Sequence, residues 1–174
     1  MTRAQYSLPA SGSIVGTGGG WAFYDGSTYT TGSRQTMTGG TRYLFLANGL
    51  GGETETRFLY TLPATIWDGA AINASAVGEA YSVRIQMQAA PTVVGDGYLE
   101  MTLDIGNPGV STVDIVERRF NFLKGNGVAH SISAGFPIFC RETFILNGGR
   151  FYITPSINCE AWDMAIFVQR TFSP

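Results

Sequence analysis

The amino-acid sequence predicts an all-β fold, an antiparallel sandwich, jelly roll or barrel, and two observations support this. Short segments rich in β-branched and aromatic residues follow one another along the chain, with Gly, Pro, Asn or Asp between them, as strands joined by turns do. Residues 81–89 and 98–105 also alternate apolar and polar side chains, which is typical of strands with one face on a core. Long helical segments are absent, so folds that alternate strands with helices are excluded.

The first strands of the domain are expected at residues 41–46 and 57–62, which flank a Gly-rich break at 48–52. Residues 64–80 are rich in alanine. We expect them to form either a short helix, which Asp68 could cap, or a long loop.

The two alternating segments are each apolar at odd numbers, 81–89 throughout and 98–105 from Leu99 onward. A Gly-Asp-Gly turn at 95–97 lies between them, so we expect them to be neighbours in one antiparallel sheet. Residues 111–123 are expected to hold one or two more strands, and 128–135 another.

The C-terminal part is expected to contain a hairpin. Residues 142–146 and 150–154 are aromatic and β-branched, and Asn147-Gly148 lies between them. An Asn-Gly pair favours the type I′ turn of a two-residue hairpin, because both turn residues need positive φ. A long strand at 162–172 is expected to pair centrally in its sheet, since a loose terminal strand would fray.

The low charge of the chain indicates a surface that contacts other subunits. Charged residues make up 14% of the sequence, where about 25% is usual, and Lys124 is the single lysine against ten arginines. Charge and lysine are depleted in interface cores, although a neutral soluble monomer is the alternative.

The net charge of −2 without a basic cluster argues against nucleic-acid binding. No apolar run reaches the ~20 residues that cross a bilayer, and the N-terminus lacks the apolar segment of a signal peptide.

Residues 1–40 are predicted to form an extended arm. Residues 12–40 contain nine glycines mixed with Ser and Thr, yet the segment also holds Trp21, Phe23 and Tyr24. Large aromatic residues are of little use in a free linker. We therefore expect the arm to lie on the protein's own sheet, on a neighbouring subunit or on a larger assembly, with a flexible tail as the alternative.

The two cysteines, Cys140 and Cys159, lie in apolar, strand-like contexts. A reduced, buried and inert pair is expected there. A disulfide between neighbouring strands is the alternative.

The sequence carries no catalytic signature. His130 is the single histidine, and with two distant cysteines it cannot complete a zinc site. It occupies a polar position of a strand, so we expect a surface or subunit-contact residue. No nucleophile elbow surrounds a serine, and no Gly-rich loop precedes Lys124.

Carboxylates are the remaining catalytic candidates, because glycosidases need two of them. Glu160 and Asp163 flank Trp162, and Glu53 and Glu55 lie in an expected loop. Without a further sign of a cleft, we expect the protein not to be an enzyme and to need no cofactor.

The layout of the chain resembles that of small virion proteins of tailed bacteriophages. The features that carry this resemblance are the Gly/Ser/Thr-rich arm with its aromatic residues, the low charge and the final long strand. Such proteins include capsid decoration or cement proteins and trimeric knobs of tails and fibres, which are similar to the jelly roll of tumour necrosis factor. The resemblance implies a jelly-roll sandwich at residues 41–174 that follows the arm at 1–40.

What the resemblance further implies is a homotrimer made in a host cytoplasm and located in the virion. If the protein is a cement protein, the arm is expected to lie across the major capsid protein shell, with Trp21, Phe23 and Tyr24 as its anchors. Deleting residues 1–35 is then expected to leave a folded trimer that no longer binds shells.

The alternative hypothesis is that the protein is a tail-tip or fibre knob that binds a receptor or a host-surface glycan. In that case exposed aromatic residues, with Tyr98, Trp67 and Trp162 as candidates, would stack on sugars.

Overall fold

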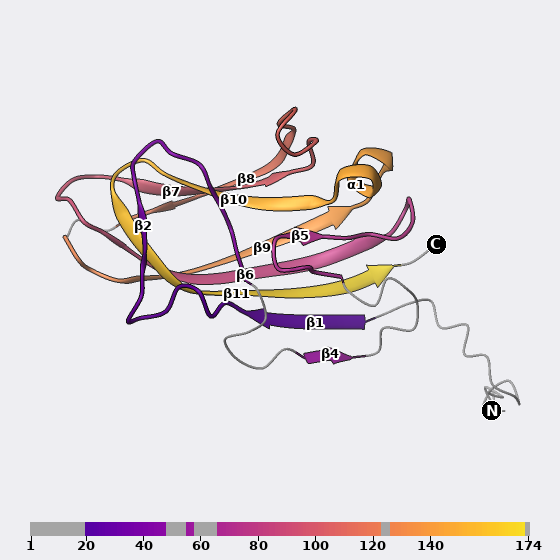
Figure 1. The fold of residues 1–174 in the computed structure, drawn as a ribbon, viewed down its shortest axis with the longest axis horizontal. Coiled ribbons are helices and arrows are strands. Elements are labelled where there is room, and N and C mark those ends of the chain that lie inside the picture. Colours follow the sequence, from indigo (N-terminus) through magenta and orange to yellow (C-terminus); the bar gives the residue numbers. More distant parts are fainter. Residues whose placement is uncertain (1–19, 48–54, 58–65, 123–125, 173–174) are drawn as a thin grey trace, which may run out of the picture.

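Two antiparallel β-sheets pack face to face with the hydrophobic core between them (Figure 1). The structure, a computed structural model, describes residues 20–47, 55–57, 66–122 and 126–172. The elements in chain order are β1 (Gly20–Asp25), β2 (Gln35–Met37), β3 (Tyr43–Leu44), β4 (Glu55–Arg57), β5 (Ala71–Ile72), β6 (Ala80–Pro91), β7 (Tyr98–Asp104), β8 (Asp114–Asn121), β9 (His130–Phe139), α1 (Glu142–Asn147), β10 (Gly149–Pro155) and β11 (Cys159–Phe172). The predicted all-β antiparallel sandwich is confirmed.

The first sheet has six strands in the order β4-β1-β11-β6-β9, and β2 pairs with one end of β11. The second has five strands in the order β3-β10-β7-β8, and β5 pairs with β10. The last strand, β11, lies between β1 and β6, so its predicted central position is confirmed.

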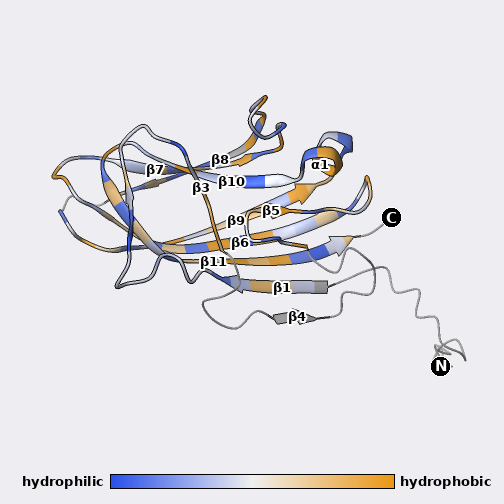
Figure 2. Cartoon of the chain, viewed as in Figure 1, coloured by the Kyte–Doolittle hydropathy of each residue, from blue (hydrophilic) through white to orange (hydrophobic). Residues whose placement is uncertain are grey.

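The period-2 alternation of residues 81–89 and 98–105 correctly identifies the core face of β6 and β7. Along β6 the odd-numbered side chains from Tyr81 to Ala89 are buried, and Leu99, Met101 and Leu103 of β7 are fully buried. Figure 2 shows apolar and hydrophilic residues interspersed along the strands of both sheets.

The expectation that these two strands are neighbours is wrong, because β6 and β7 lie in different sheets. The segment at 92–97 crosses from one sheet to the other and is held at both ends. Thr92 N–H donates to the Asn158 carbonyl (2.9 Å), and the Gly97 carbonyl accepts from Phe122 N–H (2.8 Å). Alternation shows which face of a strand is buried. It does not show which sheet the strand belongs to, because both sheets of a sandwich bury one face in the same core.

The predicted hairpin around Asn147-Gly148 is also wrong, because residues 142–147 form the helix α1. Gly148 has a φ of 71°, and its N–H donates to the Phe144 carbonyl (2.8 Å). The Asn-Gly pair therefore ends a helix, where a glycine at positive φ is equally favoured. The helical turn buries Phe144 and leaves Leu146 83% exposed, while β10 takes its partners from β7, β3 and β5.

Residues 66–79 form no helix; they are a long loop, the other alternative expected of 64–80, interrupted by the short strand β5. Trp67 forms a bridge with Ile72, and β5 joins the five-stranded sheet. Asp68 does cap a local turn, since its Oδ1 accepts from the N–H groups of Ala70 (3.0 Å) and Ala71 (2.8 Å), in the manner of an Asx turn.

The other expected strands are present with different bounds. The segment at 41–46 contributes only the two residues of β3, while 111–123 holds the single strand β8, and β9 extends four residues beyond the expected end at 135. Most of the segment at 57–62 lies outside the described residues, and only its first residue belongs to β4.

Residues 20–40 lie on the protein's own sheet, which was one of the three alternatives for the arm. All six residues of β1 pair with β11, and β2 pairs with the start of β11. The deletion of residues 1–35 would remove β1 from beside the central strand, so we no longer expect it to leave a folded domain. Residues 1–19 lie outside the described part of the chain.

Candidate interaction surface

The middle of the outer face of the six-stranded sheet carries little charge. In antiparallel pairing, directly opposed residues project to the same side, so the register of the sheet defines this face. Across its middle, the outer face is formed by Trp21, Phe23 and Asp25 of β1, Ala165, Phe167 and Gln169 of β11, Ser82, Arg84 and Gln86 of β6, and Ser133, Gly135 and Pro137 of β9. Of these residues Asp25 and Arg84 are charged, and most of the others are small or aromatic. At the edge of the sheet, the register pairs Trp21 with Arg57 and Phe23 with Glu55 of β4.

Three aromatic side chains gather at the β1 side of this outer face. The rings of Trp21 and Phe167 are stacked, with centroids 5.8 Å apart and planes inclined by 29°. Phe23 lies directly opposite Phe167. All three side chains are half-buried, so each keeps apolar area in contact with solvent.

The three predicted anchor residues therefore separate into two groups. Trp21 and Phe23 lie on the outer face, where a partner can reach them. Tyr24 points the other way, is 8% exposed and belongs to the core. Odd and even positions of a strand face opposite sides, so one strand could not present all three residues.

The outer face of the five-stranded sheet is different, because ion pairs cover it. Arg119 pairs with Glu100 (2.8 Å) and Glu117 (3.0 Å), and Arg42 pairs with Asp104 (3.1 Å) and Asp114 (2.7 Å). The middle of the six-stranded sheet, across β11, β6 and β9, therefore carries fewer charges on its outer face than the five-stranded sheet does.

The tryptophans suggested for sugar stacking do not present free rings. Trp67 is fully buried, and its indole N–H donates to the Ala47 carbonyl (2.7 Å). Trp162 is 4% exposed, and the guanidinium of Arg34 covers its ring at 4.0 Å from the centroid. Tyr98 is half-buried with Arg119 4.9 Å from its ring centre.

The carboxylates beside Trp162 have local partners. Glu160 forms an ion pair with Arg34 (3.2 Å), and Asp163 accepts a hydrogen bond from the Thr31 hydroxyl (3.3 Å). Asp163 also has a φ of 51° and lies at a break in the β6–β11 register. Of the other suggested pair, Glu53 lies outside the described residues, and only the backbone of Glu55 is described.

His130 lies at the start of β9 and is half-buried. Its ring is 5.5 Å from that of Phe122, and its buried Nε2 has no hydrogen-bond partner among the described residues. The expected polar surface position is therefore only partly correct, because the ring packs against an aromatic side chain.

Both cysteines are fully buried and reduced, as expected. Burial raises the pKa of the Cys140 thiol to about 12, and the Glu79 carboxylate adds to this rise. Burial likewise raises the pKa of Cys159 to about 12, with a contribution from Glu160. Thiols in this state are poor nucleophiles and poor metal ligands.

Within residues 20–47, 55–57, 66–122 and 126–172, no three His, Cys, Asp or Glu side chains are grouped as a metal site would require. The same part of the chain contains no helix of the length and apolar character needed to span a membrane.

Comparison with known proteins supports the fold but gives no family. No protein-family model matches the sequence, and no curated protein sequence matches it. Among solved structures, the Eiger tumour necrosis factor of S. frugiperda superimposes with a TM-score of 0.53 at 8% identity, covering 89% of this chain and 93% of that one. This similarity assigns the sandwich to the jelly-roll type of tumour necrosis factor.

Two further matches have lower TM-scores. The globular domain of zebrafish complement 1qA gives 0.41 at 10% identity, covering 87% of this chain and 94% of that one. A chain of the empty virus-like particle of cowpea mosaic virus gives 0.32 at 16% identity, covering 96% of this chain and 84% of that one.

Proposed function

We propose that this protein is a structural component of a bacteriophage particle that assembles as a homotrimer and binds the major capsid protein shell as a cement or decoration protein. The observation that carries the proposal is the middle of the outer face of the six-stranded sheet, which has few charges and a half-buried aromatic group, Trp21, Phe23 and Phe167. The proposal includes no catalytic activity, no cofactor and no nucleic-acid partner.

The composition of this face is that of an interface core. Aromatic residues are enriched and charges are depleted where subunits meet, and buried Trp and Tyr side chains supply much of the binding energy. Ser82, Ser133 and Gly135 are small and permit close approach of another chain. A ring of three copies with cyclic symmetry would join this face of each copy to a different surface of the next.

Light scattering of the purified native protein tests the oligomer. We expect a mass of about three times the 18.7 kDa of the chain. The variant Phe167→Arg places a charge in the aromatic group and is expected to shift the mass to that of a monomer, because an unpaired charge in an interface is strongly unfavourable. A matched control is Thr154→Arg on β10 of the other sheet, which is expected to remain trimeric. A monomeric wild-type protein would contradict the proposal.

The shell-binding role is tested separately. Residues 1–19 are rich in Gly and Ser and precede β1 directly, so removing them leaves every described strand in place. Full-length and shortened protein are mixed with phage shells that lack this protein, and bound copies are counted after sedimentation. We expect the full chain to bind and the shortened one to bind less. Failure of the full chain to bind would reject the cement role while leaving the trimer intact.

The second candidate is a tail-tip or fibre knob that binds a receptor or glycan. A polar pocket beside Arg42 and Tyr152, on the opposite side of the sandwich from the aromatic group, favours this alternative. The copy number separates the two candidates, since cement proteins cover the shell in many copies and tip proteins are few. Quantitative mass spectrometry of purified particles measures it.

A further inference from the structure

A pocket of about 280 Å³ lies in the outer face of the six-stranded sheet, beside a bulge in β11. At the bulge, Asp163 and Met164 of β11 face the single residue Met87 of β6. They bond instead to the segment that follows β1, since Asp163 N–H donates to the Tyr29 carbonyl (3.0 Å) and Gly26 N–H donates to the Met164 carbonyl (2.8 Å). The ladder between β11 and β6 is therefore interrupted at this point, which leaves a hollow in the face.

The polar groups that line this pocket are accessible to a partner. Asp163 is exposed, and its Oδ2 accepts a hydrogen bond from the Thr31 hydroxyl (3.3 Å), so its Oδ1 is available. Asp25 is half-buried and supplies a second carboxylate, and the half-buried Phe23 forms an apolar wall. The other polar lining residues are two half-buried glutamines and two exposed serines, Gln86, Gln88, Ser131 and Ser133.

An arginine side chain matches the chemistry of this pocket. Ionised carboxylates only accept hydrogen bonds, whereas a guanidinium donates up to five of them in one plane. A guanidinium also packs against an aromatic ring such as that of Phe23. The sequence contains ten arginines and one lysine, so arginine is the cation that a second copy of this chain is best able to supply.

The geometry of a ring of three limits which surface of the next copy can reach the pocket. Each copy fills a wedge of about 120° around the axis, so the outward directions of its two contact surfaces differ by about 60°. The outer face of the five-stranded sheet points the opposite way from the pocket (Figure 1) and does not meet this condition. A side of the sandwich does, and one such side is formed by the edge strands β8 and β9, which contact each other.

Arg118 of β8 extends from this side of the sandwich. It lies opposite the buried Met101 in the register of β7 with β8, so it leaves its strand toward the inner face, yet its side chain is exposed. Its Nη1 donates to the Glu117 carbonyl (3.3 Å). Within the described part of the chain, Arg118 has no carboxylate partner, so its charge is available to another copy.

Arg118 and the pocket lie at the same level along the strands. The rings of Phe122 and His130 are 5.5 Å apart, which places the end of β8 beside the start of β9. Arg118 precedes that contact by four residues, and Ser133 at the rim of the pocket follows it by three. A ring whose axis runs along the strands therefore brings Arg118 of one copy to the pocket of the next.

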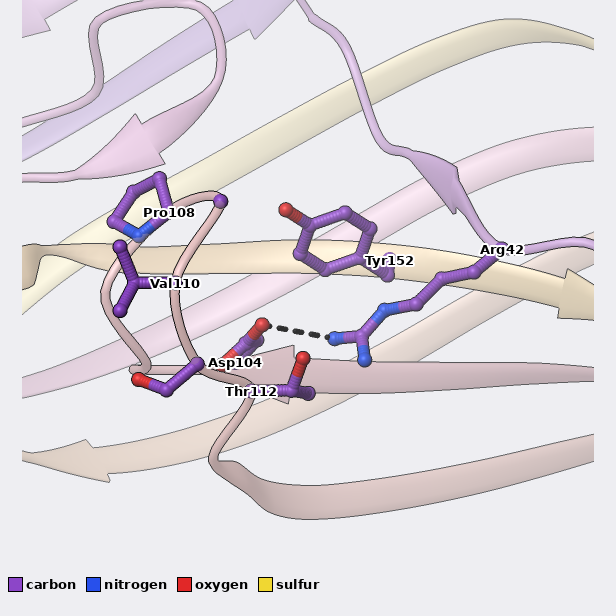
Figure 3. Close-up of a pocket in the computed structure, with 8 residues that line it drawn as sticks. Arg42, Asp104, Pro108, Val110, Thr112 and Tyr152 are labelled. Atoms are coloured by element: carbon purple, nitrogen blue, oxygen red, sulfur yellow. Dashed lines mark hydrogen bonds and ion pairs between the residues drawn. The ribbon is translucent and has the colours of Figure 1, made fainter.

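The other arginines whose side chains are described fit less well. Figure 3 shows one of them, Arg42, paired with Asp104 beside Tyr152 on the opposite sheet. Arg84 lies on the same face as the pocket, and two more lie on either side of α1, at the far end of β9 from the pocket. The arginines already paired with carboxylates are Arg34, Arg42, Arg119 and Arg170, and those beside α1 are Arg141 and Arg150.

We propose that Arg118 of one copy inserts into the pocket at Asp25 and Asp163 of the next copy, and that three such contacts close the homotrimer. This inference rests on the proposed trimer and adds the second contact surface, which is the side of the sandwich formed by β8 and β9. The guanidinium donates to the two carboxylates and packs against Phe23.

Charge exchange tests this contact, with dissociation of the full-length trimer on dilution followed by analytical ultracentrifugation. Arg118→Glu places a carboxylate against Asp25 and Asp163, and Ser133→Lys places an ammonium group in the pocket against Arg118. Each variant is expected to raise the concentration at which the trimer dissociates about tenfold, because close charge pairs across an interface couple strongly. The double variant again opposes unlike charges and is expected to dissociate at a lower concentration than either single variant.

The matched control is Arg119→Gln, which changes the neighbouring arginine on the other side of β8. Arg119 forms exposed ion pairs with Glu100 and Glu117, and such pairs contribute little, so we expect the dissociation of the wild-type trimer. Circular dichroism shows whether each variant is folded. If Arg118→Glu is not, Asp163→Asn decides the test: asparagine tolerates the φ of 51° at this position, and loss of the charge is expected to weaken the trimer.

Three results would overturn the inference while leaving the trimer in place. These are an Arg118→Glu variant that dissociates as the wild type does, an equal weakening by Arg119→Gln, and a double variant no more stable as a trimer than the better single variant. A wild-type protein that is monomeric at every concentration rejects the proposed trimer itself, and this inference with it.

Discussion

Arg170 and Glu79 form a fully buried ion pair, with Arg170 Nη1 3.0 Å from Glu79 Oε1 and side chains that are 2% and 1% exposed. The pair joins the end of β11 to the residue before β6. The carboxylate also accepts from the hydroxyl (2.6 Å) and N–H (2.8 Å) of Ser75 and from the Tyr81 hydroxyl (2.8 Å). Buried charges persist only when they are paired and hydrogen-bonded in this way.

Replacing Arg170 with Met is expected to destabilise the protein by about 3–5 kcal/mol, because it leaves the Glu79 carboxylate buried without its countercharge. Urea unfolding followed by tryptophan fluorescence measures the free energy of unfolding. The control is Glu117→Gln, which removes a pair whose side chains are both 55% exposed and is expected to change little. Equal losses of unfolding free energy in the two variants would show that the buried ion pair contributes no more to stability than the exposed one.

Stability is expected to fall as the pH is lowered through the acidic range. Burial alone raises the pKa of Glu79, but hydrogen bonds from Ser75 and Tyr81 outweigh it and hold the pKa below its usual value of 4.5. A carboxyl with a lower pKa in the folded state adds stability above its unfolded pKa and loses it as the pH falls through the folded pKa. Unfolding free energies measured from pH 7 downward should therefore begin to decrease below about pH 5. The Glu79→Gln variant should show a weaker pH dependence, and an unchanged dependence would assign the effect to other carboxylates.

Gly106→Ala is expected to disrupt the loop beside Asp104 and to cost about 1–3 kcal/mol, the range for overpacking. A Cβ at this position would overlap the carbonyl oxygen of Ser111, which is backbone and cannot move aside without breaking the turn. Gly32→Ala is the matched control, since a Cβ there meets nothing within 4 Å. Thermal unfolding compares the two, and similar midpoints would mean that the loop shifts at no cost.

Cys140 and Cys159 are expected to resist alkylation in the folded protein at pH 8. Their pKa values of about 12 leave almost no thiolate, and burial blocks access. Mass spectrometry after iodoacetamide treatment should show no adduct on native protein and two adducts in guanidinium chloride. Rapid labelling of native protein would indicate that the strands around these residues open frequently.

The sequence predicted the core faces of the strands well, because alternation follows directly from strand geometry. Tyr81, Val83 and Ile85 are buried as that pattern requires. It could not predict the sheet to which β7 belongs, because both sheets bury their inner faces in the same core. It also could not distinguish a hairpin at Asn147-Gly148 from a helix end, since both need a glycine at positive φ.

The candidate surface was predictable only in part. Aromatic residues in a Gly-rich segment indicated a contact, and two of the three, Trp21 and Phe23, lie on the outer face. Phe167 was missed, because its role depends on a pairing between β1 and β11 that joins distant parts of the chain. The pocket beside Arg42 was missed for the same reason, as Asp104 and Tyr152 come from separate strands.

The position of β11 has a consequence for synthesis on the ribosome. This strand joins β1 to β6, yet it emerges after both, so the nascent chain holds two separate fragments of sheet until β11 is available. Non-local pairing of this kind slows folding, and the open strand edges of β1 and β6 are then able to pair with other chains. We therefore expect that yields of folded protein will depend on how quickly β11 inserts between β1 and β6.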